Sequence, residues 1–575
     1  MNKGKSYNVN VQMPDWFRAT FNRQTLGRGG KQNLKSILIP FLITLVIGLA
    51  RFYKELPALN IKSLSCWGFL ISELLIYIFV KAVYLSVKKE EEKHFRIPVI
   101  LTVIAVLVLV LGTAFSARIF HAKAYSRILQ VTEGSVEDIP SQEGSDAIAL
   151  MDTSSAQMLG DREIGSLTNL VSQFNVGSYI QIDYSSRPVK VAALRFDGFF
   201  KWMGNREQGV PGYVVVDPVD MDADYVSLEN GMKYVPSAWF QRNLGRQLRF
   251  HYPSLMFRNV HFEIDEDGKP WYIAPYYTYT IGLFGGEQVM GAVIADPVTG
   301  EMTRYAAADL PGWVDVIYDG DLICLQYNDA AQLQNGFLNT LFGQKDCRRV
   351  TTMSRDDDED TLYPDFGYIA KGGDIWIYTG VTSVNGDSSN LGFILSNERT
   401  EETRFITCAG ADEFSAMRSA EGEVQEKNYK ASFPSLINVD NIPTYIMVLK
   451  DANGLVKMYA AVNVNQYNMV ATASTQKACI EKYNMLVKGE ISADQAVDTE
   501  GAVPEIDTSS FAEKQIMISK IETIVQQGNT YIYIVDEEGQ IYHAKYADVI
   551  GMILHDEGDT LTILTDGTNF ILPEE

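Results

Sequence analysis

The chain has 575 residues, more than one hydrophobic core usually organises, so several domains are expected. Hydrophobic residues make up 46% of the chain and charged residues 21%, which excludes disorder along its whole length, and the formal charge of −23 disfavours binding to nucleic acid. This total hides two parts of opposite sign. Residues 1–127 contain 18 Lys and Arg against 6 Asp and Glu, a net of +12, so the remainder carries −23 minus 12, or −35. A basic front and an acidic bulk are typical of a membrane anchor followed by a solvated domain.

Three apolar runs near the N-terminus predict membrane-spanning helices. The clearest run, 97–117, has 21 residues without a charge and is long enough to cross a hydrocarbon core of roughly 30 Å. The run at 63–87 is also long enough but contains two charges, and the run at 37–53 is shorter. We therefore expect about three spans within a transmembrane region of residues 35–120.

Basic residues in the loops predict the orientation of these spans. Lys and Arg are concentrated in the segment 1–34 and in the short loop 88–96. The positive-inside rule places both in the cytoplasm. With three crossings, the chain after about residue 118 lies outside the cell membrane. If the run at 37–53 does not cross, two spans would return the bulk of the chain to the side of the N-terminus.

Glu73 is the acidic residue within the predicted spans. Acids in a membrane often serve as proton relays or ion ligands. The alternative is that Glu73 pairs with a neighbour such as Lys81 or anchors helix packing. We favour this alternative, because the three segments contain no second acid and no His.

Polar, acidic stretches divide the rest of the chain. They lie within 121–147, 355–360 and 491–510. The expected plan is a cytoplasmic basic segment (1–34), the transmembrane region (35–120), a linker (121–147), two α+β modules (148–350 and 361–490) and a small β-barrel (511–575).

Strand signals dominate these modules. Segments rich in Val, Ile and Tyr predict strands at 179–184, 189–196, 213–217, 375–381 and 531–535. Helices are predicted at 237–250 and 474–486 by apolar residues on one face, the second beginning with Ser474 as its N-cap. The last 65 residues contain short strands with Gly turns, which predict a barrel of SH3 or OB type. The fold class is therefore about three transmembrane helices followed by an α+β, mostly antiparallel-β ectodomain of several modules.

One hairpin pattern recurs along the ectodomain. A strand, a short acidic turn ending in Gly and a second strand occur at 262–273, 293–305, 447–462 and 532–544. In addition, 251–265 and 431–451 each lead through Pro-Ser-Leu into a strand and such a hairpin. These echoes predict that the second α+β module is a duplication of part of the first.

The combination of a helix and an antiparallel meander with the hairpin Ile-Ala-Asp-Pro-Val-Thr-Gly-Glu at 294–301 resembles PepSY-type modules. Such modules occur in extracytoplasmic parts of Gram-positive membrane proteins. The resemblance covers 237–306 and 431–490. It implies a binding or inhibitory module rather than a catalyst, and it carries over no functional residue.

Metal-ligating residue types occur together at one strand. Alternation along a strand would put His261, Glu263 and Asp265 on one face, where they would suit Zn or Mn. The alternative, an exposed polar strand face, is the interpretation we favour.

Two acidic runs suggest calcium. The first contains four carboxylates, at Asp217, Asp220, Asp222 and Asp224. An EF-hand counted from Asp220 would need Gly and Glu where the chain has Tyr225 and Gly231, so that loop is excluded. A looser calcium site there, or at Asp356, Asp357, Asp358 and Asp360, is the alternative to a solvated charge run, which we favour. We expect no cofactor, with calcium as the weaker option.

No catalytic residue is predicted. Ser474 and Lys477 match the Ser-x-x-Lys of penicillin-binding proteins, but the required Lys-Thr-Gly does not follow. The five cysteines fit no zinc pattern. Cys324 and Cys347 would form a disulfide in an oxidising exterior, although buried free thiols are the better interpretation. The aromatic run 271–280 is either an exposed binding strip or a buried strand, and we favour burial.

The sequence favours a membrane-anchored extracytoplasmic interaction or scaffold protein without evident catalysis. Its expected partners are the lipid bilayer and a protein or a second copy of itself, and no nucleic acid. One alternative is a cell-envelope hydrolase, for which His261 and Glu263 are the nominees. The other is a transport or sensing component that uses Glu73.

Overall fold

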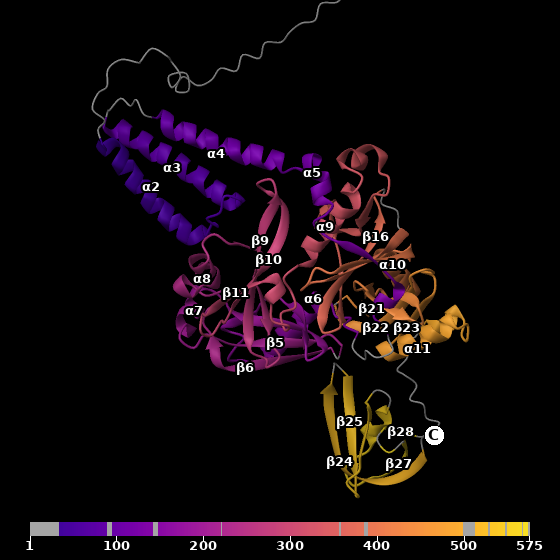
Figure 1. Ribbon diagram of the computed structural model, residues 1–575. Helices are drawn as coiled ribbons and strands as arrows, with labels where there is room; N and C mark the ends of the chain where they lie inside the picture. Colours follow the sequence, from indigo (N-terminus) through magenta and orange to yellow (C-terminus); the bar gives the residue numbers. More distant parts are fainter. Residues whose placement is uncertain are drawn as a thin grey trace, which may run out of the picture. The chain divides into compact units, whose positions relative to one another are not determined.

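The computed structural model describes residues 34–88, 95–141, 148–219, 221–355, 358–384, 389–452, 454–497, 512–526, 529–546, 549–565, 567 and 569–572. The chain divides into two compact units, 1–497 and 498–575. Figure 1 shows the helical N-terminal region, the sheets that follow it and the small C-terminal sheet.

Three apolar helices open the described chain, which confirms the predicted transmembrane region by length and composition. They are α2 (Leu34–Glu55), α3 (Leu64–Lys88) and α4 (Arg96–Phe115). In Figure 1, α3 lies between α2 and α4, and α3 contacts both. At most 17% of the residues in each span are buried within the protein, as expected for helices surrounded by lipid.

One end of this helical region contacts the ectodomain at two separate points. In the loop 56–63, the Leu59 N–H donates to the Pro253 carbonyl at 2.7 Å. Just after α4, the Ser116 hydroxyl oxygen accepts the Leu283 N–H at 2.9 Å. The loop between α2 and α3 and the end of α4 therefore lie at the same end of the helices, as three crossings require.

Four antiparallel sheets follow one plan within the described part of 148–473. In each, two short strands pair with the same long strand, which continues into a meander of two more strands. The first sheet contains β2 (Phe174–Val176), β3 (Ile180–Tyr184), β4 (Arg187–Phe196), β5 (Val210–Asp217) and β6 (Asp222–Met232). The second contains β7 (Met256–Phe257), β8 (His261–Ile264), β9 (Pro270–Ile281), β10 (Gly285–Ala295) and β11 (Met302–Ala306). The mostly antiparallel β-structure predicted after the helices is thus confirmed.

The third and fourth sheets repeat this plan. The third contains β12 (Arg348–Val350), β15 (Gly367–Lys371), β16 (Asp374–Ser383), β17 (Ser389–Asn397) and β18 (Thr403–Ala411). The fourth contains β19 (Lys430–Ala431), β20 (Ser435–Val439), β21 (Ile442–Lys450), β22 (Val456–Asn463) and β23 (Val470–Ala473). Since β12 pairs with β16, the third sheet joins residues on both sides of the acidic stretch 355–360. The hairpin of β13 (Thr352–Arg355) and β14 (Asp358–Pro364) lies between these strands in the sequence.

A shared turn supports the view that the four sheets are repeats. After the middle strand of each meander, an Asp or Asn carboxyl or amide oxygen accepts backbone N–H groups two or three residues further along, as in an Asx turn. The residues are Asp217, Asp296, Asn397 and Asn463. The two segments expected to be related, 251–265 and 431–451, lie in the second and fourth of these repeats.

Each sheet packs on the next one in sequence order. Separate buried clusters join the first sheet to the second, the second to the third and the third to the fourth. The fourth sheet contacts the segment that precedes the first sheet, because the Lys450 ammonium pairs with Asp152 at 2.5 Å. In addition, β3 contacts β8, and β15 contacts β20. This series of sheets, each packed on the next, resembles successive blades of a β-propeller.

Helices connect the strands, and most of them begin at side-chain caps. They include α6 (Thr153–Ser166), α7 (Phe199–Asn205), α8 (Leu244–His251), α9 (Gly320–Leu333), α10 (Glu413–Glu423), α11 (Gln476–Val487) and α12 (Ala493–Ala496). The helix predicted at 237–250 is divided into the 3-10 turn η2 (Phe240–Arg242) and α8, because Asn243 caps the Arg246 N–H. The cap of α11 is Thr475 rather than Ser474, since the Thr475 side chain accepts the Ala478 N–H.

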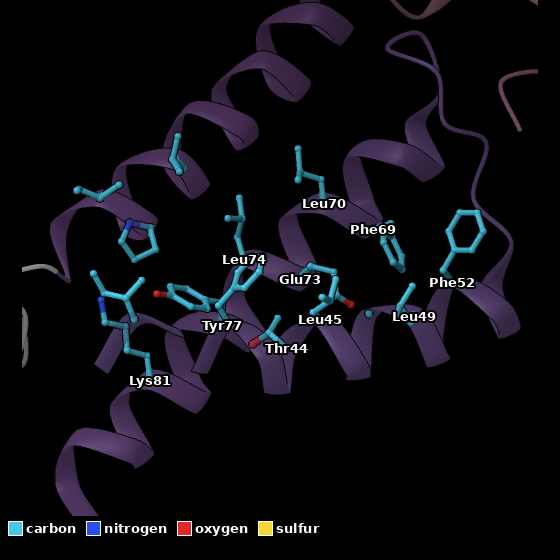
Figure 2. A pocket seen from close by; sticks show the side chains of 16 residues that line it. Thr44, Leu45, Leu49, Phe52, Phe69, Leu70, Glu73, Leu74, Tyr77 and Lys81 are labelled. Carbon is cyan, nitrogen blue, oxygen red and sulfur yellow. The ribbon is translucent and has the colours of Figure 1, made fainter. Parts of the chain in front are cut away.

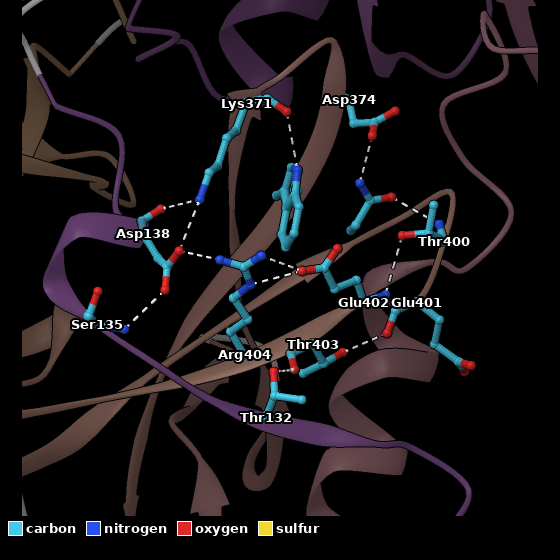
Figure 3. A network of polar contacts seen from close by, with 12 residues as sticks. Thr132, Ser135, Asp138, Lys371, Asp374, Thr400, Glu401, Glu402, Thr403 and Arg404 are labelled. Atoms are coloured by element: carbon cyan, nitrogen blue, oxygen red, sulfur yellow. Dashed lines mark hydrogen bonds and ion pairs between the residues drawn. The ribbon is translucent and has the colours of Figure 1, made fainter.

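The stretch 121–147, expected to be a linker, contains regular structure over its described residues. The helix α5 (Arg118–Tyr125) leads into β1 (Val131–Gly134), which pairs in parallel with β18. The polar network in Figure 3 then ties Asp138 to the third sheet through Arg404 and Lys371. This strap, residues 131–141, is therefore part of the third sheet's edge.

We predict that Arg404→Met loosens the strap and lowers the free energy of unfolding by about 1–2 kcal/mol, because Asp138 and Glu402 lose their shared cation. Limited proteolysis of the full-length protein should then cut within 131–141. The control is Arg418→Met on α10, where the side chain is exposed. Equal resistance of the two variants to protease would contradict a role for Arg404 in holding the strap.

The C-terminal unit is a small, nearly closed sheet, as predicted for a barrel. Its strands are β24 (Ala512–Gln526), β25 (Asn529–Asp536), β26 (Ile541–Lys545), β27 (Thr560–Thr565) and β28 (Phe570–Ile571). The long strand β24 pairs with β27 along its first half and with β25 along its second half. A bridge between His543 and Asn569 brings the two ends of the sheet together.

Candidate functional site

A cavity of about 220 Å³ lies where the first three sheets meet. Strands β3, β4, β8 and β15 contribute to its lining, together with the turn after β17 and the start of α9. Its polar lining residues include Tyr179, Gln181, Lys190, His261, Asp319, Asp321, Tyr368 and Glu398. The packing of the first three sheets on one another places these side chains together although they are far apart in the sequence.

Lys190 brings a buried positive charge to this cavity. It lies in the middle of β4 and is only 3% exposed. Its ammonium lies 5.3 Å from the centroid of the Tyr368 ring, a cation–π contact. Burial lowers the pKa of Lys190 to about 8, although the carboxylates of Asp152 and Glu398 act in the opposite direction.

Glu398 brings a buried carboxyl to the same cavity. It follows Asn397 in the Asx turn after β17 and is 2% exposed. Burial raises the pKa of Glu398 well above its ordinary value, and the negative charges of Asp319 and Glu263 raise it further. Among the described residues, no ion pair joins Glu398 to Lys190. A base and an acid are therefore present in one cavity without neutralising each other directly.

Two buried polar atoms at the cavity have no hydrogen-bond partner among the described residues. They are Gln181 Nε2 and Glu398 Oε2. Tyr179 also lines the cavity, but its Oη lies against Gly160 of α6. Buried polar atoms without a partner cost about 1–3 kcal/mol each, and buried polar groups in proteins almost always have partners. A polar molecule that fits the cavity would supply these partners.

The structure brings two of the three metal-ligand nominees, His261 and Glu263, together and separates Asp265 from them. His261 lines the cavity, and its Nε2 lies 2.9 Å from Glu263 Oε1. Glu263 is fully buried and accepts the N–H groups of Asp315 and Val316, so it holds the segment before α9. Asp265 lies beyond β8, where it accepts the Trp271 indole N–H at 2.8 Å. Over the described ranges, no three His, Cys, Asp or Glu side chains are arranged to hold a metal ion.

A second acid lies beside Glu263. Asp315 is 1% exposed and accepts the Asp183 N–H at 2.7 Å. Burial and the nearby Glu263 carboxylate raise the pKa of Asp315 well above its ordinary value. The centre of the sheets therefore has more acids than bases, and Lys190 is the cation that lines the cavity.

The calcium nominees have other contacts or lie outside the described residues. Asp217 takes part in its own Asx turn and pairs with Arg187 at 2.8 Å. Asp222 and Asp224 lie on β6. Asp220, Asp356 and Asp357 are outside the described residues, as are the side chains of Asp358 and Asp360.

Two further interpretations are confirmed. The five cysteines are free thiols, and those outside the membrane helices are buried. The aromatic run 271–280 lies in β9, whose first half is largely buried between sheets. Lys477, from the Ser-x-x-Lys match, is exposed on α11.

Glu73 lies in a separate apolar groove among α2, α3 and α4. The groove has a volume of about 520 Å³, and Figure 2 shows Glu73 among apolar side chains with Tyr77 and Lys81 further along α3. The Arg51 guanidinium donates to Glu73 at 2.5 Å and also pairs with Glu55 at 3.0 Å. Glu73 thus has a cationic partner from α2, in agreement with the pairing interpretation but with a different residue.

No family model matches this protein, and no curated protein matches it. Among solved structures, an exo-beta-1,3-galactanase from Clostridium thermocellum is 11% identical, with a TM-score of 0.17 over 69% of this protein and 72% of the galactanase. A levansucrase mutant from B. megaterium is 9% identical, with a TM-score of 0.17 over 77% of this protein and 96% of the levansucrase. Similarities this low carry no argument.

Proposed function

We propose that the protein is a membrane-anchored, extracytoplasmic interaction protein that binds a small polar ligand in the cavity between its sheets. The observation that carries this proposal is the presence of Lys190 and Glu398, both buried, in one cavity where polar atoms of Gln181 and Glu398 have no hydrogen-bond partner among the described residues. Buried charges are costly without a partner, and proteins keep them where a ligand uses them.

The chemistry of the lining favours a zwitterion such as a free amino acid. A ligand carboxylate would pair with the Lys190 ammonium and accept a hydrogen bond from Gln181. A ligand ammonium would pair with Glu398, because Asp319 already pairs with Arg258. The volume of about 220 Å³ suits a molecule of this size. A ligand with only one charge would leave either Lys190 or Glu398 without a charged partner in the ligand.

The sidedness of the protein is part of the proposal. The basic segment 1–34 and the loop 88–96 support a cytoplasmic location for both. The contacts from loop 56–63 and Ser116 put the ectodomain at the opposite end of the helices. The cavity would then bind its ligand outside the cell. The presence or absence of the ligand would be communicated to a protein partner or to a second copy of the protein.

A hydrolase is the second candidate, favoured by one observation. The raised pKa of Glu398 suits a general acid, and Asp319 and Asp321 supply further carboxylates in the same cavity. This alternative requires a glycan to enter a cavity of 220 Å³, whereas a free amino acid fits without rearrangement.

The test measures the melting temperature of the full-length protein in detergent with each of the twenty common L-amino acids, added singly. At least one should raise the melting temperature, because binding to the folded state at 100 times Kd adds about 2.7 kcal/mol. The methyl ester and the N-acetyl form of the same amino acid should not. If none raises it while the protein cleaves cell-wall glycan, the hydrolase interpretation replaces this one.

Ligand affinity should fall as the pH rises above about 8. The ligand carboxylate needs Lys190 protonated, and the pKa of Lys190 in the free protein is about 8. Above this pH each further pH unit should weaken binding about tenfold, since protonation must precede binding. Titration calorimetry between pH 6.5 and 9.5 checks this. An affinity that stays constant across that range would exclude Lys190 as the carboxylate partner.

A further inference from the structure

Large apolar side chains are exposed beside the C-terminal end of α2. This group, the aromatic patch, consists of Phe200, Met203, Trp239, Phe240 and Phe250. Phe200 is 78% exposed and Phe240 is 51% exposed. Exposed apolar side chains that occur singly need no explanation, but a contiguous group marks an interaction surface.

Ring contacts hold most of this patch together. Phe199, at the start of α7, has its ring centroid 5.4 Å from that of Phe200, 5.1 Å from that of Trp239 and 6.2 Å from that of Phe240. The buried Trp202 also contacts Phe240 at 5.7 Å. The patch is therefore a built surface on α7 and η2 rather than a set of independent side chains.

The aromatic patch is continuous with the end of α2. The ring of Phe250 lies 6.2 Å from that of Phe52 and 6.4 Å from that of Tyr53. Arg246 links the two parts, because its guanidinium lies 4.0 Å from the Tyr53 ring centroid and donates to the Phe240 carbonyl at 2.5 Å. The patch therefore begins where the predicted membrane span ends.

A second exposed group, the distal patch, lies beside the end of α4. It consists of Phe115, Ile119, Phe120, Leu338, Leu341 and Phe342. The helix α5 packs on α9, and Arg118 pairs with Asp329 at 2.5 Å. The π-helical turn η4 (Asn339–Gly343), which follows α9, carries Phe342, 84% exposed.

We propose that both patches insert into the interfacial layer of the bilayer, so that the ectodomain rests on the membrane beside its own helices. Each patch adjoins the end of a helix at which the chain leaves the membrane. Because each patch is continuous with a membrane-spanning helix, lipid is favoured over a separate protein as its partner. Trp, Phe and Met with a neighbouring Arg are the residue types that suit this layer. The acids beside the aromatic patch are neutralised, since Asp197 pairs with Lys201 and Glu207 with Arg242.

This proposal is independent of the ligand cavity and is tested by tryptophan fluorescence in vesicles. Full-length protein is reconstituted into phosphatidylcholine containing lipids brominated near the headgroup or deep in the acyl region. Trp239→Phe removes the reporter in the aromatic patch, and Trp376→Phe removes a buried tryptophan of the third sheet as the matched control. Trp67, at the start of α3, supplies a constant background.

We expect quenching by the shallow bromines to decrease with Trp239→Phe and to stay unchanged with Trp376→Phe. Phe342→Trp should add a shallowly quenched signal from the distal patch. The proposal is overturned if Trp239 is unquenched by either lipid while aqueous acrylamide quenches it. It is equally overturned if neither lipid nor acrylamide reaches Trp239, because a protein then covers the patch.

Discussion

Replacing Lys190 with Met is expected to make the protein more stable and unable to bind its ligand. Burial lowers the pKa of this ammonium from 10.5 to about 8, so keeping it charged inside the protein costs up to about 3 kcal/mol. Met fills a similar volume without a charge. The melting temperature of the full-length protein should rise by roughly 5 °C at pH 7, whereas the ligand-induced shift should disappear.

The pH dependence of this gain separates the charge from simple repacking. Because Lys190 has a lower pKa in the folded than in the unfolded state, the unfolded state binds more protons between about pH 8 and 10.5. The stability of the unmodified protein therefore rises relative to Lys190→Met through this window, and the advantage of the variant fades. Lys477→Met, at an exposed position, is the control and should change neither property. A variant less stable than the parent at pH 7 would contradict the burial argument.

Arg51→Leu is expected to have the opposite effect and to prevent accumulation of folded protein in the membrane. It leaves Glu73 without its cation inside the apolar groove, and an unpaired buried charge costs about 3–5 kcal/mol. Glu73→Gln should be milder, because no charge remains to be paired at that position. The double variant Arg51→Leu, Glu73→Leu should recover most of the loss. Fluorescence-detected gel filtration of detergent extracts measures the folded fraction of each.

Glu55→Gln is the matched control for Arg51, since Glu55 also pairs with Arg51 but is exposed. It should cost less than about 1 kcal/mol. If Glu73→Gln folds normally yet abolishes the activity of the protein in cells, Glu73 has a role in transport or sensing. If the double variant is no better than Arg51→Leu alone, the ion pair is not what stabilises the helices.

The membrane helices and the small barrel could be predicted because their signals are local. A run of about twenty apolar residues has few possible structures other than a membrane-spanning helix. Strands that are joined by Gly turns, such as 531–535, pair with their neighbours in the sequence. The fourfold plan of the sheets is not local. Its short edge strands, such as β7 and β19, have two residues each. Two residues are too few for a sequence pattern, so these strands are identified only by their pairing with a long strand.

Lys190 was not predicted, although the sequence contains a signal for it. From Val189 to Leu194, apolar residues occupy both the odd and the even positions around it, so both faces of the strand are apolar. This pattern is typical of a strand that is buried on both faces. The ammonium group of a lysine within such a run cannot reach water and is therefore buried. Arg51 was missed for a related reason, because a basic residue near the end of a span usually reaches the lipid headgroups, whereas Arg51 faces Glu73. His261 was nominated, but as a metal ligand rather than as a cavity residue.

The account depends most on the ectodomain facing the exterior, and one labelling measurement tests this directly. Intact cells producing Lys477→Cys or Lys93→Cys are treated with a membrane-impermeant maleimide before and after permeabilisation. Lys477 is exposed on α11, and Lys93 belongs to the basic loop 88–96. We expect the position on α11 to react in intact cells and the loop position to react only after permeabilisation. The reverse pattern would place the cavity and both patches in the cytoplasm and contradict the proposed function.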